Sequence, residues 1–162
     1  MHGLGNDFMV VDGVNQAMPL SAEQVTALGN RHMGIGFDQL LVIAPPETQE
    51  ADFNFIIFNQ DGSLAEQCGN GARCVARFIQ QEGLSAKKEL RLFTAGKITT
   101  VTLEDQGWVT VQMPAPLISP ANSLKIANNL ITFHLVDMGN PHAVTFVDEI
   151  KDSFDLPVSV VV

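Results

Sequence analysis

The first third of the chain alternates between short apolar stretches and turn residues. Residues 9–11 and 40–43 are continuous apolar runs, and residues 52–58 alternate apolar and polar positions. Short apolar runs between turn residues predict buried strands, and alternation with period two predicts a strand with one covered face. Residues 59–62 follow as a turn, because asparagine, aspartate and glycine all favour turn geometry. These segments predict the first strands of a β-sheet.

Two segments carry the spacing of helices. Residues 21–31 begin with Ser21, which can cap the first turn, and Glu23 places a negative charge beside the helix start. Residues 71–82 form a second predicted helix that ends at Gly83. Its apolar positions occupy much of the helix circumference, so we expect this helix to be deeply buried.

The remaining apolar segments predict further strands on both sides of a proline-rich stretch. They are residues 90–93, 97–103 and 108–113, with turns at Gly96 and Gly107, and then residues 131–136 and 143–147. Residues 114–120 contain three prolines, which prevent a regular ladder and stiffen a connection. We therefore predict a first domain over residues 1–115, followed by a linker and an incomplete second part over residues 116–162.

Composition excludes several classes of function. The chain has 162 residues, of which 46% are hydrophobic and 17% charged, so it can bury a core. A net charge of −9 repels nucleic acid and anionic membranes, and no apolar run approaches the roughly 20 residues of a membrane span. The two cysteines, Cys68 and Cys74, have no zinc-type spacing and form no disulfide framework. A cytoplasmic protein with reduced thiols is the simplest interpretation.

The strongest chemical feature is Cys68, followed by Gly69, Asn70 and Gly71 immediately before the predicted buried helix. A helix start offers unpaired N–H groups and positive potential, which favour a thiolate and can hold a carboxylate. A cysteine after a loop can also be purely structural. Cys74 lies about 9 Å further along the helix axis and on another face, so core packing is its expected role.

Other polar residues have two possible roles. The segment from His2 to Phe8 is rich in glycine, but it lacks the lysine and hydroxyl of a phosphate loop. Five amide residues could either stabilise a turn or strand end or bind a ligand: Asn6, Gln39, Asn59, Asn70 and Asn140. His142 follows Pro141 at a predicted strand start, where a histidine is more often structural than catalytic.

Together these features resemble the diaminopimelate epimerase family from the first residue to about Asp148. The matching segments are residues 2–8 (HGLGNDF), 36–39 (GFDQ), 58–63 (FNQDGS), 67–74 (QCGNGARC) and 138–142 (MGNPH). They follow the family's order at about its spacing, which is more specific than any single motif. The related proline racemases and phenazine-biosynthesis proteins share the fold, but their thiol loops fit less well.

The resemblance implies an α/β (α+β) fold of two similar halves, each a curved mixed sheet wrapped around a central helix. It implies a cytoplasmic homodimeric isomerase that interconverts LL- and meso-diaminopimelate for lysine and peptidoglycan synthesis, without pyridoxal phosphate or metal. Cys68 would exchange the α-proton with a second thiol, and His142 would support catalysis. The residues expected to bind substrate are Asn6, Gln39, Asn59, Gly69, Asn70 and Asn140. Two thiols on opposite faces of the substrate suit such chemistry, because one removes the proton and the other returns it.

The sequence departs from the family in lacking the second thiol motif, Cys-Gly-[Ser/Thr]-Gly. Gly5-Asn6 and Gly139-Asn140 form a faint internal repeat, so the spacing from Asn6 to Cys68 predicts the second thiol roughly near position 202. We expect the chain to be clipped at both ends or to be a truncated gene product, and in either case to be inactive alone. A non-catalytic binding or dimerising half is the main alternative, and a redox-sensing pair of Cys68 and Cys74 is a weaker one.

Overall fold

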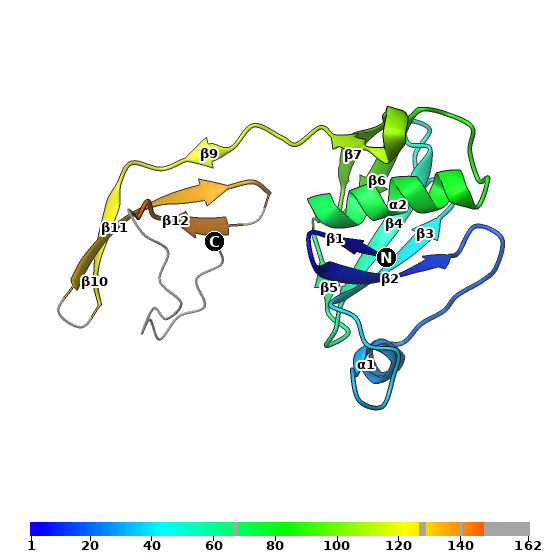
Figure 1. Cartoon of the computed structure of the whole chain (residues 1–162), viewed down its shortest axis with the longest axis horizontal. Helices are drawn as coiled ribbons and strands as arrows, with labels where there is room; N and C mark the ends of the chain where they lie inside the picture. The colour runs from blue at the N-terminus through cyan, green and yellow to red at the C-terminus, as the bar shows by residue number, and fades with distance from the viewer. Residues whose placement is uncertain (67, 127–128, 140, 148–162) are drawn as a thin grey trace. The chain divides into compact units, whose positions relative to one another are not determined.

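The computed structural model describes residues 1–66, 68–126, 129–139 and 141–147 (Figure 1). The chain forms two compact units, Met1–Met113 and Pro114–Val162. The division falls at the start of the proline-rich stretch. Its interpretation as one epimerase half, residues 1–115, and the beginning of another stays a prediction.

The first unit is built on one mixed sheet of eight strands. In chain order these are β1 (His2–Gly3), β2 (Asn6–Asp12), β3 (Gln39–Ala44), β4 (Phe53–Asn59), β5 (Leu64–Ala65), β6 (Glu89–Thr94), β7 (Lys97–Leu103) and β8 (Val109–Val111). Neighbours follow the order β1-β2-β3-β4-β6-β7-β8, and β5 pairs with β4. The pairs β2–β3 and β4–β6 are parallel, whereas the other pairs are antiparallel.

Helix α2 (Gly69–Gln81) lies across one face of this sheet (Figure 1). It contacts β1, β2 and β3 towards one edge and also β7 and β8 at the other. A single helix reaches both edges only if the sheet curves around it. The predicted curved mixed sheet around a central helix is therefore confirmed, and its apolar core includes Leu41, Ile57 and Val75.

The prediction that α2 is deeply buried holds for most of its circumference. Ala72, Val75, Ala76 and Ile79 follow the three-and-four spacing of one face, and the buried Cys74 extends the covered surface further around the helix. Arg73 and Arg77 are half-buried and Gln80 is exposed on the remaining circumference. The sheet covers a broad stripe of α2, and the remaining strip carries polar side chains.

Helix α1 (Ala22–Gly29) packs on the opposite face of the sheet, where Val25, Phe37 and Leu40 form a smaller cluster. Ser21 caps it as predicted, because its hydroxyl accepts from the Gln24 N–H while the Gln24 side chain accepts from the Ser21 N–H. The helix ends two residues before the predicted end. A short 3-10 helix, η1 (Asp105–Gly107), leads into β8.

The second unit is a small antiparallel sheet. Its strands are β9 (Leu117–Ile118), β10 (Asn122–Ile126), β11 (Asn129–Asp137) and β12 (Pro141–Val144). The long strand β11 pairs with β10 along its first part and with β9 and β12 along its second. The expectation that residues 114–120 form no ladder is wrong, because Ile118 pairs with Val136 between Pro116 and Pro120. Neither β10 nor the early start of β12 was predicted.

Among the described residues, no helix is long and apolar enough to cross a membrane.

Candidate active site at the start of helix α2

Cys68 is the residue on which helix α2 begins. It occupies the N-cap with an extended backbone, and its Sγ accepts a hydrogen bond from the Gly71 N–H at 3.2 Å. A Cβ on Gly71 would lie 3.3 Å from the Cys68 Sγ and 3.3 Å from the Leu41 Cδ1. Glycine at this position therefore lets the thiol sit close between the helix start and strand β3.

The pKa of the Cys68 thiol lies above its ordinary value because burial disfavours the thiolate. The N–H groups of Gly71 and Asn70 and the Arg73 guanidinium oppose this effect without cancelling it. The helix start therefore acts in the predicted direction, but the expected net gain of thiolate character is wrong, because desolvation is the larger influence. In this structure Cys68 is a half-buried thiol.

Cys74 lies in the core, with 5% of its surface exposed. Burial also raises the pKa of its thiol. Its expected role in packing is confirmed, and the two cysteines have different surroundings: one borders a pocket and the other is enclosed.

A pocket of about 430 Å³ opens beside the Cys68 thiol, and all of its lining belongs to the first unit. One side is formed by the first residues of α2: Cys68, Gly69, Asn70 and Arg73. The other side is apolar and consists of Val109, Val111 and Met113. A ligand in this pocket would meet a thiol and hydrogen-bond donors on one side and an apolar wall on the other.

Gln39 and Asn59 lie directly opposite each other on strands β3 and β4, on the face that carries the core residues Leu41 and Ile57. The Gln39 Nε2 donates to the Asn59 Oδ1 at 3.0 Å, and the Asn59 Nδ2 donates to the Ser63 Oγ at 3.0 Å. The Gln39 Oε1 is buried and has no hydrogen-bond partner in the described part of the chain. It is therefore a buried acceptor that the described hydrogen bonds leave unused.

The start of α2 lies against the same end of these strands. A Cβ on Gly3 would approach the Asn70 Cβ within 3.1 Å, and Gly3 pairs with Asn6 across the β1–β2 hairpin. Gly71 touches Leu41, two residues beyond Gln39. Of the sequence-predicted residues, Cys68, Gly69 and Asn70 line one pocket, Gln39 and Asn59 bind each other, and Asn6 pairs with Gly3, which lies against Asn70.

The two remaining predicted residues belong to the second unit. Asn140 lies outside the described residues. His142 pairs with Val136 on β11 and lines a pocket of about 510 Å³ together with Leu117, Ile118 and Leu135. Its predicted place beside the thiol stays a prediction.

Comparison with known proteins identifies the family. The family model described as diaminopimelate epimerase matches residues 1–118, which include the whole thiol pocket and the strands around it. The chain belongs to the diaminopimelate epimerase family.

Curated relatives in this family are similar over almost the whole chain. A diaminopimelate epimerase of Psychrobacter arcticus is 46% identical over 94% of this chain and 57% of its own length. One from Laribacter hongkongensis is 46% identical over 93% of this chain and 58% of its own length. The chain therefore spans a little more than half the length of the curated relatives it matches.

Solved structures share the fold at low sequence identity. A hydroxyproline epimerase from Agrobacterium vitis has a TM-score of 0.61 and 19% identity over 76% of this chain and 39% of its own. A phenazine biosynthesis protein of the PhzF family from Bacillus anthracis has a TM-score of 0.61 and 16% identity, over 90% of this chain and 51% of its own. The diaminopimelate epimerase family thus shares its architecture with both groups.

In this member of the diaminopimelate epimerase family, an ion-pair network that was not predicted from the sequence connects strand β2 with the residue just before strand β3. Arg31 donates to both Asp7 oxygens, at 2.9 and 2.7 Å, and to the Asp38 Oδ1 at 2.8 Å. The hydrogen bonds from Arg31 hold the pKa of Asp7 well below its usual range. The two aspartates adjoin Asn6 and Gln39 in the sequence, which is the one signal that would have indicated the network.

Proposed function

We propose that this chain provides the first catalytic half of a diaminopimelate epimerase, which interconverts LL- and meso-diaminopimelate in lysine and peptidoglycan precursor synthesis. The observation that carries the proposal is a thiol at a helix N-terminus, Cys68, bordering a pocket that the Asn70 amide also lines, with the hydrogen-bonded amides of Gln39 and Asn59 on the same sheet. The relatives named diaminopimelate epimerase support the same substrate class. Amino-acid epimerisation is the chemistry that this set of groups suits best.

The substrate α-carboxylate would bind at the start of α2, near Gly69 and Asn70. Backbone N–H groups and the positive helix end stabilise an anion there, and the stabilisation grows as negative charge develops on deprotonation. The unpaired Gln39 Oε1 would accept a hydrogen bond from a substrate ammonium group. Asn6 and Asn59 would orient the rest of the molecule.

Cys68 would exchange the α-proton with one face of the substrate. Because burial raises the pKa of Cys68, its thiol is protonated at neutral pH before substrate binds. It is then ready to donate a proton, and in the reverse direction the thiolate receives one. Reversible epimerisation therefore needs a second acid/base group on the opposite face.

That second group is proposed to lie outside this sequence, since Cys74, the other cysteine, is enclosed in the core. We further propose that Asn140 and His142 contribute to the same site, that the protein works as a cytoplasmic homodimer, and that the 162-residue chain alone is inactive. Removal of one of two cooperating groups costs most of the rate.

The test is exchange of the substrate α-proton with deuterium from heavy water, measured by mass spectrometry on LL- and meso-diaminopimelate. A protein extended to the length of the relatives is expected to catalyse exchange and epimerisation. Cys68→Ser should lower the rate by at least about a thousandfold. Cys74→Ala serves as the matched control and should keep most of the activity of the folded protein.

Robust epimerisation by the 162-residue chain alone would overturn the need for a second group. An extended protein that binds diaminopimelate without exchanging its α-proton would favour the non-catalytic binding half.

A further inference from the structure

Arg73 stands one turn inside α2 and lines the thiol pocket together with Cys68, Gly69 and Asn70. It is half-buried, and it is the one charged side chain among the described residues that line this pocket. The remaining lining is a thiol, a glycine, an amide and three apolar side chains. Arg73 is therefore the source of positive charge in the lining of this pocket, beside the thiol and the amide.

The first of these groups is the Asn70 amide. The Arg73 Nη2 donates to the Asn70 Oδ1. A guanidinium has donors and no acceptor, so this contact fixes which end of the amide faces Arg73. The Asn70 Nδ2 is thereby left to donate to another acceptor. The Gly3 backbone confines the amide from another side, since a Cβ on Gly3 would lie 3.4 Å from the Asn70 Cγ.

The second group is the Cys68 thiol. Arg73 favours its thiolate form, as do the N–H groups of Gly71 and Asn70, whereas burial opposes it. The other titratable groups near the thiols are Cys74 in the core and the Met1 ammonium, which donates to the Phe8 carbonyl oxygen at 2.9 Å. Strands β3 and β8 contribute the apolar Leu41, Val109 and Val111 and the neutral Gln39 to this region, and none of these side chains is titratable.

We propose that Arg73 is a positioning residue of the thiol pocket. It orients the Asn70 amide so that the Nδ2 donates to a bound carboxylate, and it keeps a positive charge beside Cys68. Its contribution to proton transfer rests on the proposed epimerase function. Its two local effects do not, because they act on Asn70 and Cys68 whatever reaction the pocket serves.

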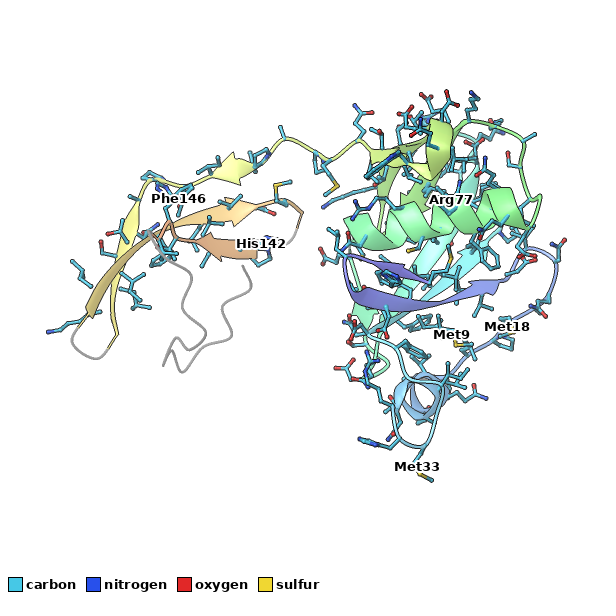
Figure 2. All side chains as sticks on the ribbon, in the orientation of Figure 1. Met9, Met18, Met33, Arg77, His142 and Phe146 are labelled. Carbon is cyan, nitrogen blue, oxygen red and sulfur yellow. The ribbon has the colours of Figure 1, made fainter. Side chains whose placement is uncertain are left out.

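Arg77 provides a matched control on the same helix (Figure 2). It lies one turn further from Cys68 and donates to the Gln80 Oε1 at 2.8 Å. It lies against η1, where a Cβ on Gly107 would be 3.5 Å from the Arg77 Nη2, and it does not line the thiol pocket. Removing its charge changes the net charge of the helix by the same amount as removing that of Arg73.

The first experiment measures how fast iodoacetamide alkylates Cys68 in the 162-residue chain as a function of pH, with peptide mass mapping to separate Cys68 from Cys74. Arg73→Met is expected to raise the apparent pKa of Cys68 by about 0.5 to 1 unit, because an attractive charge is lost. Arg73→Lys, which keeps the charge, should stay within about 0.3 unit of the unmodified protein. Arg77→Met should also stay within that range.

The second experiment follows the side-chain amide of Asn70 by 15N–1H NMR, assigned through its disappearance in Asn70→Ala. Arg73→Met should shift the two Nδ2 proton resonances and speed their exchange with water. Arg73→Lys should restore most of the original pattern, and Arg77→Met should leave it unchanged. Thermal unfolding of each variant shows that it is folded.

Equal effects of Arg73→Met and Arg77→Met on the pKa of Cys68 would overturn the proposal, and so would an Asn70 amide indifferent to Arg73→Met. Neither readout needs turnover. An extended protein without epimerase activity whose Cys68 still responds to Arg73 would refute the proposed function and leave this inference standing.

Discussion

The two units of the chain use the same kind of strand but bury their apolar residues to very different extents. In the first unit, α2 covers the inner face of the sheet, and Leu90, Leu92 and Val101 are fully buried. In the second unit, Leu117 is 72% exposed and Leu130 is 72% exposed, and Phe146, labelled in Figure 2, is 88% exposed. No helix is found in the described part of the second unit.

This difference shows what each level of structure contributes. Strand pairing satisfies backbone hydrogen bonds in both units, whereas removal of apolar area from water requires a second layer on the sheet. The first unit has that layer, and its helix also delivers Cys68 to the end of the sheet where Gln39 and Asn59 lie. Core formation and placement of the site therefore depend on the same element.

The largest expected effect is at the contact between α2 and the sheet. Ile79→Ala removes a fully buried side chain and should lower the free energy of unfolding by about 2 to 5 kcal/mol, because it leaves a cavity. Leu135→Ala in the second unit, where the side chain is 49% exposed, should cost about 1 kcal/mol or less. Urea unfolding followed by circular dichroism measures both, and equal losses would contradict the contrast between the units.

An intermediate effect is expected when the two thiols within the first unit are compared. Cys68 borders a pocket, whereas Cys74 is enclosed, so iodoacetamide at neutral pH should label Cys68 at least about tenfold faster. The relevant difference is access, since burial raises the pKa of both thiols. Peptide mass mapping after short exposure gives the two rates. Faster labelling of Cys74 in the folded protein would contradict the burial of its side chain in the core.

The smallest effect concerns a carboxylate at the margin of the first unit's core. Burial by itself raises the pKa of Asp52, but the Lys87 ammonium at 2.5 Å and the Arg91 N–H at 2.8 Å outweigh it and hold the pKa below its usual value. Its contribution to stability is therefore present above the unfolded-state pKa, roughly 4, and is lost as the pH falls through the lower folded-state value. Because Lys87 is 65% exposed, solvent screens the pair and limits the gain.

Asp52→Asn should accordingly lower the free energy of unfolding by about 1 kcal/mol at pH 7 and flatten its decline in acid. Asp105→Asn is the control, because Asp105 meets Lys88 at 3.7 Å with both side chains almost fully exposed. Urea titrations between pH 2 and pH 7 compare the two variants. Identical pH profiles of the two variants would show that Asp52 makes no pH-dependent contribution to stability.

Local sequence patterns were sufficient for the longer strands of the first unit and for the cap of α1, but not for the two-residue strands β1 and β5. Apolar runs bounded by turns locate β2, β3 and β4, and Ser21 makes the expected capping box with Gln24. These elements depend on hydrogen bonds and side-chain alternation within a few residues. The short strand β9 was missed for the opposite reason, since its pairing partner Val136 lies far along the chain and no local signal reveals it.

The motifs in the sequence also named most of the candidate site: Cys68 with its glycines, and the amides Asn6, Gln39, Asn59 and Asn70. Only the tertiary structure decided how these residues are placed and charged. The pairing of Gln39 with Asn59, the Arg31 network and the contact of Gly3 with Asn70 join residues distant in the sequence. The direction of the Cys68 pKa shift was likewise decided by burial against the folded core, which outweighs the helix start that the sequence itself encodes.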